Sequence, residues 1–357
     1  MPMWKRLGFL LVFVVPALML AAAWLAQLSG LADLMAWFPL FFLFVLLPLA
    51  DYALGHDARN PLPAQVATLD ADSWFRRLTL ATLPVQLGVL AWSGWHFVHA
   101  DMGPAGNLGW LLSQGIVGGV LAINTAHELI HKDTRAEGLA GGLLLTSVGY
   151  HGFKIEHLRG HHVHVSTPLD ASSARYGQSL WHFMPRALCR NTANAWRLEA
   201  RRLSRRGQRW WHWRNEMLQW SALWLVLAAV FTLWLGAHGL AFFLVQGFFA
   251  ACSLEIINYI EHYGLQRKSV GDGRYERTTH LHSWNSDYAL SNLLLFHLQR
   301  HSDHHETPRR RYQSLVHHAD SPQLPGGYAA MFVLAMVPPL WFRLVNPRVE
   351  AFHSARS

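Results

Sequence analysis

The stretch Leu108–His131, LGWLLSQGIVGGVLAINTAHELIH, joins a long apolar run to a pair of histidines. Its run from Leu108 to Leu129 contains no lysine or arginine and is long enough to cross the roughly 30 Å hydrocarbon core of a bilayer as a helix. His127 and His131 are four residues apart, so they lie on one face at the end of that helix. The stretch therefore predicts a membrane span that ends in a histidine pair.

Five more apolar runs of about 20 residues accompany this one, and lysine and arginine are absent from all six. Only 15% of the residues are charged, whereas a soluble domain carries about 25%. We expect an all-α integral membrane protein with six transmembrane helices, in which residues 1–357 form a single membrane-embedded catalytic domain. Lys5 and Arg6 before the first run also suit a signal peptide, but the length of that run favours a retained helix. The predicted spans are residues 7–28, 31–50, 78–98, 108–129, 218–235 and 240–260.

The distribution of positive charge predicts the orientation. All 30 lysines and arginines lie in four blocks, and the short connections after the first, third and fifth spans contain none. By the positive-inside rule, the four blocks and both termini are cytoplasmic, in a multi-pass protein of the bacterial inner membrane. The net charge of +8 on that face predicts contact with anionic lipid headgroups and with an acidic protein. We expect no nucleic-acid partner.

Two further histidine boxes and one single histidine lie in the predicted cytoplasmic segments 131–217 and 261–357 or at their edge. One metal ion needs only three or four protein ligands, so this number of imidazoles suits two ions of Zn, Cu, Fe or Ni. The charge-based topology places all of them on one side of the membrane at a similar depth. The proposed ligands are His127, His131, His157, His161, His162, His262, His301, His304 and His305.

Acidic residues near the boxes are candidates to accept the outer N–H groups of the ligand histidines. The alternative is that they only balance a basic face. His297, one turn before His301, is expected to support a ligand or to line the cavity. This outer group comprises Glu128, Glu156, Glu255, Glu261, His297 and Asp303. Aromatic residues of the second span are candidates for a substrate channel, although such residues commonly face lipid; they are Trp37, Phe38, Phe41, Phe42 and Phe44.

A zinc protease and a metal transporter are two other classes of protein that the sequence brings to mind. The sequence His127-Glu-Leu-Ile-His131 matches the zinc metalloprotease motif H-E-x-x-H, but a protease needs one more ligand and leaves six histidines without a role. A metal transporter should carry ionisable residues along its spans, and here the span centres are almost free of charge. Cys189 and Cys252 are too few for a disulfide framework or an iron–sulfur module.

Several motifs resemble the membrane-bound alkane 1-monooxygenases (alkane ω-hydroxylases) of the membrane fatty acid desaturase and hydroxylase superfamily. The resemblance covers roughly Asp51 to Arg348. The singleton His-Tyr-Gly element distinguishes alkane hydroxylases and their xylene-oxidising relatives from ordinary desaturases. The matching segments are NTAHELIHK (124–132), EHLRGHH (156–162), TPLDASS (167–173), NYIEHYGL (258–265), HSWNS (282–286) and LQRHSDHH (298–305).

The resemblance implies a non-haem di-iron centre held by the nine histidines. It also implies that O2 and two electrons serve to hydroxylate the terminal carbon of an n-alkane drawn from the membrane. Electrons would come from a rubredoxin, reduced by a rubredoxin reductase, and the lack of rubredoxin cysteines here requires a separate donor protein. The nearest alternative substrates are methyl groups on aromatic rings and fatty acyl chains. Tyr288, where some relatives have histidine, has no assigned role.

Overall fold

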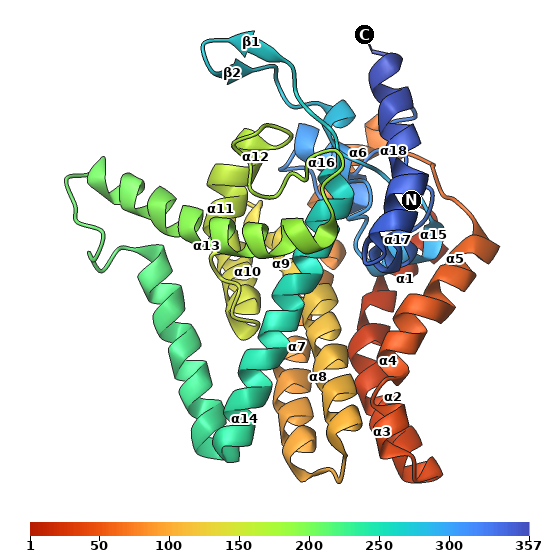
Figure 1. The fold of residues 1–357 in the computed structure, drawn as a ribbon, viewed down its shortest axis with the longest axis vertical. Helices are drawn as coiled ribbons and strands as arrows, with labels where there is room; N and C mark the ends of the chain where they lie inside the picture. Colours follow the sequence, from red (N-terminus) through yellow and green to blue (C-terminus); the bar gives the residue numbers. More distant parts are fainter. Residues whose placement is uncertain (357) are drawn as a thin grey trace.

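The computed structural model describes residues 1–356, which are mostly helical (Figure 1). One short antiparallel hairpin, of strands β1 (Ser269–Gly271) and β2 (Arg274–Tyr275), projects from the helices. In chain order the helical elements are α1 (Met3–Gly8), η1 (Phe9–Phe13), α2 (Val14–Ser29), α3 (Ala32–Met35), α4 (Phe38–Phe41), η2 (Phe42–Leu46), α5 (Leu47–Leu54), α6 (Pro63–Ala71), α7 (Ser73–His99), α8 (Pro104–Gly118), η3 (Gly119–Asn124), α9 (Thr125–Ile130), α10 (Arg135–Ser147), α11 (Phe153–Glu156), η4 (His157–His161), α12 (His162–His164), α13 (Leu180–Ser204), α14 (Glu216–His262), η5 (His280–His282), α15 (Ala289–Leu294), α16 (His301–Glu306), η6 (Tyr312–Ser314), α17 (Tyr328–Ala335) and α18 (Pro338–Ser354).

Four continuous helical stretches within residues 1–356 are long and apolar enough to cross a membrane: Met3–Ser29, Ala32–Leu54, Pro104–Ile130 and Glu216–His262. Together they contain five of the six predicted spans, because the last stretch is 47 residues long and holds two of them. The remaining predicted span, residues 78–98, falls on α7, a 27-residue helix that is not among the four. The structure therefore shows several apolar helices, and the number of spans stays a prediction.

The long helix α14 reverses direction at Gly236. This residue has φ +67° and ψ −159°, a conformation that is essentially restricted to glycine because a Cβ atom would clash with the backbone. In Figure 1 the two limbs of α14 run down and back up around this point. The reversal lies between the predicted spans 218–235 and 240–260, at the non-helical residue Gly236 inside α14.

Turns between long helices gather at one end of the molecule. The α2–α3 turn, the α7–α8 connection and the reversal of α14 all lie at the lower end in Figure 1. The two termini, the hairpin and the amphipathic helix α13 lie toward the opposite end. The segments that carry the histidine boxes are therefore on the side away from the three turns.

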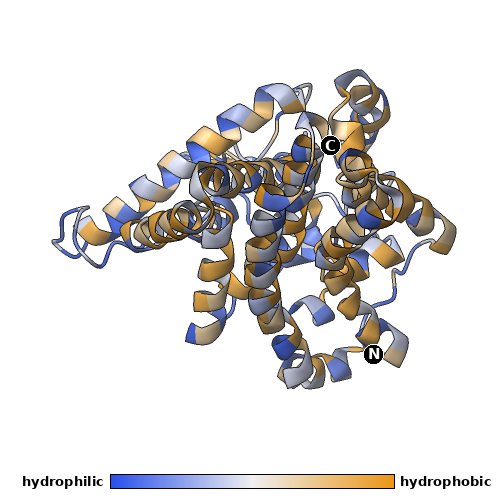
Figure 2. Ribbon diagram, turned by 90° about the horizontal axis from the view of Figure 1, so that it is seen from below, coloured by the Kyte–Doolittle hydropathy of each residue, from blue (hydrophilic) through white to orange (hydrophobic). Residues whose placement is uncertain are grey.

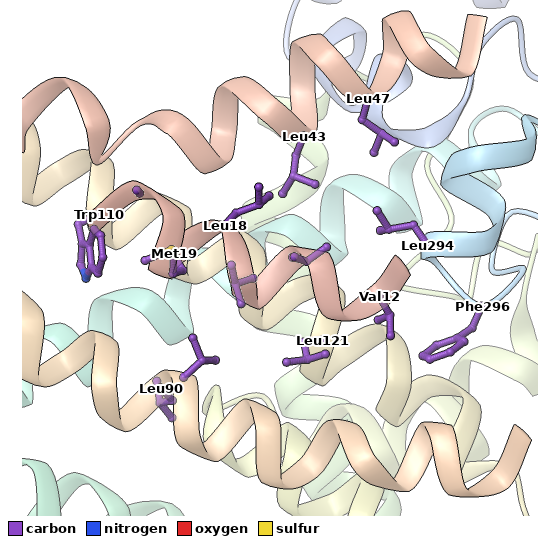
Figure 3. Close-up of a cluster of buried hydrophobic side chains, with 14 of the residues drawn as sticks. Val12, Leu18, Met19, Leu43, Leu47, Leu90, Trp110, Leu121, Leu294 and Phe296 are labelled. Atoms are coloured by element: carbon purple, nitrogen blue, oxygen red, sulfur yellow. The ribbon is translucent and has the colours of Figure 1, made fainter. Parts of the chain in front are cut away.

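Buried apolar side chains from distant parts of the chain hold the long helices together. Figure 3 shows Met19 of α2, Leu90 of α7 and Trp110 of α8 in one cluster. The Trp110 Nε1–H also donates to the Ser93 carbonyl at 3.0 Å, which ties α8 to α7. The π turn η3 and helix α14 approach closely at Gly119, where an added Cβ would lie 2.3 Å from the Ser253 hydroxyl.

Hydrophobic residues are frequent along the long helices, as the colouring of Figure 2 shows, and several of them are exposed. Leu233 is 88% exposed, and Leu20, Trp24, Leu225 and Phe248 are also exposed. A soluble protein rarely exposes so much contiguous apolar surface, whereas a bilayer solvates it favourably. The surface therefore agrees with insertion of these helices into a membrane.

Three π-helical turns interrupt the helices: η2, η3 and η4. A π turn inserts one extra residue per turn and rotates the side chains that follow it, and such turns are frequent at functional sites. Turn η3 comes immediately before the helix of His127, and η4 contains His157 and His161. A regular helix was expected through both boxes, so these turns alter the directions in which the histidines point.

Candidate metal centre

Four separate segments bring the nine box histidines to one place. Helix α9 and its end carry the first pair, η4 and α12 carry the second box, the last residue of α14 is the single histidine, and α16 carries the third box. Their side chains form two neighbouring groups, in each of which the candidate ligand atoms lie within 4.8 Å of one another. The first group is His127, His131, His157, His162 and His304; the second is His161, His262, His301 and His305.

In the first group the Nε2 atoms point at one another. The Nε2 atom of His157 is 3.0 Å from those of both His131 and His162, and the Nε2 atoms of His162 and His304 are 3.3 Å apart. The fifth member, His127, packs its ring 4.3 Å from that of His304, and its buried Nε2 has no hydrogen-bond partner among residues 1–356.

The second group repeats this arrangement with four rings. The Nε2 atom of His301 is 2.9 Å from that of His305 and 3.2 Å from that of His262. His161 completes the group, with its Nε2 3.2 Å from that of His305. The two groups are in contact, because the rings of His162 and His305 stack with centroids 4.5 Å apart.

Both groups fit a bound metal ion. Nitrogens bound at about 2.1 Å to one ion, at angles from 90° to the tetrahedral value, lie about 3.0–3.4 Å apart, close to the separations observed here. One imidazole N–H cannot satisfy several converging nitrogens, whereas a shared cation can accept all their lone pairs. The donor set, nitrogen only in these groups, suits a transition metal rather than Mg²⁺ or Ca²⁺.

Burial keeps most of these rings in the form that binds metal. A buried imidazole loses solvation when it is charged, and each ring also lies beside other histidines that repel a charge. Burial therefore lowers the pKa well below the usual imidazole value for His131, His157, His162, His301, His304 and His305. At neutral pH these rings are uncharged and offer a lone pair.

Comparison with known proteins assigns the fold to a family. Residues 102–335 match the fatty acid desaturase family. Over 98% of its length the chain is 50% identical to an alkane 1-monooxygenase 2 of Alcanivorax borkumensis, 92% of which is covered. Over 93% of its length it is 52% identical to an alkane 1-monooxygenase 2 of Pseudomonas aeruginosa, 88% of which is covered.

The chain belongs to the alkane 1-monooxygenase family. It is therefore a membrane-bound, metal-binding monooxygenase. A more distant relative is the hydroxylase component of a xylene/toluene monooxygenase from Pseudomonas putida, which is 30% identical over 66% of this chain and has 63% of its own length covered.

Asp170 supports the second group of this monooxygenase, and the sequence analysis did not single it out. Its Oδ2 lies 3.0 Å from Nδ1 of His161 and accepts a hydrogen bond from the Ser173 hydroxyl. Although burial opposes ionisation, these contacts hold the Asp170 pKa at about 2, so the residue is a carboxylate. It orients the Nε2 of His161 toward the group. Asp170 falls in one of the motif segments, but no spacing rule pairs it with His161.

Asp170→Asn should weaken metal binding at the second group by about 10–100-fold, because an outer hydrogen-bond partner fixes the tautomer and raises the basicity of its histidine. Metal titration of the apoprotein followed by competition with a chelator measures the change. Asp320→Asn serves as the control, because Asp320 is a largely exposed carboxylate that contacts His280 instead. Equal affinities in all three proteins would contradict a supporting role for Asp170.

Two of the expected carboxylates contact cations instead of ligand histidines. Glu128 lies 2.9 Å from the Lys132 ammonium group and accepts from the Tyr312 amide. Asp303 forms an ion pair with Arg310 at 2.6 Å. These pairs anchor the segment after α16 beside the metal centre. They orient the backbone that carries the ligands, rather than the rings themselves.

The other expected residues lie in different environments. Glu255 accepts hydrogen bonds from Asn191 and Asn258, as well as from Tyr150. Burial and the neighbouring Asp170 raise the pKa of Glu156 to about 8, and its side chain is hydrogen-bonded to Asn194.

His297 and Glu261 make more specific contacts. The Nδ1 atom of His297 lies 2.9 Å from the Tyr312 carbonyl, away from both groups. Glu261 is the expected carboxylate that reaches a ligand nitrogen directly, with its Oε2 3.2 Å from Nε2 of His301.

An apolar cavity extends from the metal centre between the helices. Its wall includes Ile116, Val120 and Ile257, and histidines of both groups, His127 and His301, reach it. Further apolar lining residues come from η2, α5, α15 and α17; they are Leu43, Phe44, Leu47, Leu294 and Phe332. The cavity thus joins an apolar interior to two candidate metal sites.

The aromatic residues of the second predicted span face different ways. Phe44 lines the cavity and stacks on Phe332, with ring centroids 4.7 Å apart. Trp37 donates its Nε1–H to the Ala105 carbonyl, and Phe41 is 50% exposed on the outer surface. Phe42 packs beside Phe38, and Trp37, Phe38, Phe41 and Phe42 are not part of the cavity wall. The π turn η2 places Leu43 and Leu47 on the cavity wall with Phe44.

Proposed function

We propose that this enzyme hydroxylates the terminal carbon of n-alkanes to primary alcohols, using O2 and two irons held by the nine histidines. One observation carries the proposal: an apolar cavity has histidines of both metal-binding groups in its wall. The names of the relatives that are about 50% identical support the same reaction. Irons bound by these histidines would supply the redox chemistry for activating O2, of which one atom would enter the alcohol and the other, with two electrons and two protons, would leave as water.

The cavity suits a substrate without polar groups. An alkane offers no hydrogen-bond donor or acceptor, so the cavity holds it by close apolar contact along its length rather than by polar groups. The cavity wall supplies apolar surface at Val120, Leu294 and Phe332. A chain aligned along this wall presents one end to the metal centre. The alcohol product has a polar hydroxyl group, so the apolar wall binds it less favourably than it binds the alkane.

The zinc protease alternative has less support. A protease of the H-E-x-x-H type uses the glutamate as a general base at the metal-bound water. Here Glu128 is paired with Lys132 and with a backbone amide, and the pair His127 and His131 is joined by three further histidines. Zinc has no redox chemistry, so it would not support a monooxygenase.

The membrane topology proposed with this function has six spans and both termini in the cytoplasm of a bacterial cell, within the inner membrane. We treat residues 1–357 as one catalytic domain. Support comes from the three turns at one end of the molecule, since those connections contain no lysine or arginine. The metal centre then lies at the cytoplasmic side, where a soluble electron donor can approach it.

A separate rubredoxin is the proposed electron donor, itself reduced by a rubredoxin reductase. The basic residues are concentrated in the segments around the metal centre; Arg309, for example, is 80% exposed. Such a surface attracts an acidic protein and accelerates its association at low ionic strength. His162 is less buried than the other eight ligands, which makes its side of the centre the most accessible.

Purified protein loaded with Fe(II) and supplied with rubredoxin, its reductase and NADH should convert octane or hexadecane to the 1-alcohol, as measured by gas chromatography. Elemental mass spectrometry should find close to two irons per chain. Oxidation of xylene methyl groups with no alkane turnover would instead favour the activity named for the more distant relative. One tightly bound zinc that iron cannot displace would contradict the monooxygenase chemistry.

A further inference from the structure

Glu261 occupies a position that no other carboxylate near the metal centre shares. Its Oε2 lies 3.2 Å from Nε2 of His301, the nitrogen that faces His262 and His305. Asp170, in contrast, contacts Nδ1 of His161, on the outer side of the ring. Glu261 therefore lies with the converging nitrogens of the second group, whereas Asp170 lies behind them.

The contact with His301 has an electrostatic requirement. If the Nε2 of His301 binds a metal, it carries a lone pair and no proton, so it cannot donate a hydrogen bond to Glu261. A lone pair and a carboxylate oxygen 3.2 Å apart repel each other unless a cation lies close to both. The same ion that binds His301 meets this requirement.

The burial of Glu261 leads to the same conclusion. Its side chain is 2% exposed, and its other oxygen accepts a hydrogen bond from the Tyr328 hydroxyl at 2.9 Å. Tyr328 is neutral, and among residues 1–356 no lysine or arginine forms an ion pair with Glu261, whereas Glu128 has Lys132. A buried carboxylate without a compensating cation is strongly destabilising.

We propose that Glu261 is a tenth protein ligand, donating Oε2 to the metal ion of the second histidine group while the Tyr328 hydroxyl holds its other oxygen. This inference rests on the proposed metal-dependent function. Each ion then has five protein donors, five histidines at the first site and four histidines with one carboxylate at the second. The two sites differ by one negative charge, and the harder, anionic site favours the more oxidised metal. Glu261 and His301 both line the cavity, so this site faces the substrate.

The test measures the infrared bands of the carboxylate groups rather than the rate of turnover. Apoprotein is titrated with Fe(II) without oxygen while infrared difference spectra record the carboxylate-stretching region. In the wild type, binding of two equivalents should shift carboxylate bands. In Glu261→Gln, most of the metal-induced shift of the carboxylate bands should disappear. One of the two equivalents of Fe(II) should also bind roughly 100-fold more weakly, which is at or beyond the largest effect of losing a hydrogen-bond partner behind a ligand.

Glu255→Gln is the matched control. Glu255 is buried on the same helix, and its carboxylate accepts hydrogen bonds from Tyr150, Asn191 and Asn258. This variant should keep both affinities and the metal-induced bands. Glu261→Asp retains a carboxylate but withdraws it by one methylene, so it should keep a band and weaken the same equivalent.

The possible failures are distinguishable. A wild-type protein that binds no metal would contradict the proposed function. A wild type that binds two equivalents without any change in its carboxylate bands would overturn the assignment of Glu261, whatever the stability of the variants. An unchanged spectrum and unchanged affinities in Glu261→Gln would also overturn it.

Discussion

His262→Ala is expected to bind one metal ion per chain instead of two and to lose at least 99% of alkane hydroxylation, since loss of a ligand costs more than the about 10–100-fold caused by loss of an outer partner. The second group has only four histidines, and His262 is in contact with the other three, His161, His301 and His305. Loss of one ring removes a donor nitrogen from the site with fewer histidines, so we expect its ion to bind too weakly to remain through purification. Elemental analysis and product formation from octane measure both effects.

His297→Asn is the control for this experiment. His297 is as buried as the ligands, but its Nδ1 faces the Tyr312 carbonyl and its backbone has φ +55°. Asparagine tolerates positive φ and keeps an N–H donor in a similar place. This variant should reach the membrane and keep both ions. Two ions and full activity in His262→Ala would show that the single histidine is not a ligand.

Phe44→Ala is expected to raise the ratio of hexadecane to octane turnover by about tenfold. Removal of the ring enlarges the cavity where Phe44 stacks on Phe332, so a longer chain fits along the wall, while a short chain loses its contacts with the ring. Values of kcat/KM for octane, dodecane and hexadecane give the profile.

Phe41→Ala provides the comparison, because Phe41 is on the same segment but is 50% exposed and does not line the cavity. Its chain-length profile should match that of the wild type. A profile that stays unchanged when Phe41, Phe42 and Phe44 are all replaced by alanine would contradict the role of this segment as a channel wall.

The arrangement of the outer carboxylates shows what sequence proximity misses. Glu128 and Asp303 lie next to or near box histidines in the chain, yet each pairs with a cation. Asp170 is nine residues from His161 and contacts its ring, because η4 and the loop after α12 fold back together. Adjacent residues on a helix point about 100° apart, so a neighbour in sequence rarely shares the direction of a ligand.

The division of the histidines into two groups also could not be predicted from the sequence. His161 and His162 are adjacent in the chain but belong to different groups, as do His304 and His305. Spacings of three and four predict a shared helix face, but the π turn at η4 and the meeting of four segments decide which rings converge. Phe44 and Phe41 are also close in the chain, yet Phe44, in the π turn η2, lines the cavity and Phe41 faces outward.

The sequence by itself determined that this protein is a membrane-bound helical enzyme of the alkane 1-monooxygenase family with nine histidines gathered on one side. Long uncharged runs, clustered positive charge and spaced histidines are local properties that any fold of the chain must respect. Only the tertiary structure decided how these histidines divide into two groups, that the cavity reaches both, and that Glu261 faces a ligand nitrogen. Those features depend on side-chain directions between segments that are separate in the chain, such as those of His161 and His305, which packing sets and local pattern does not.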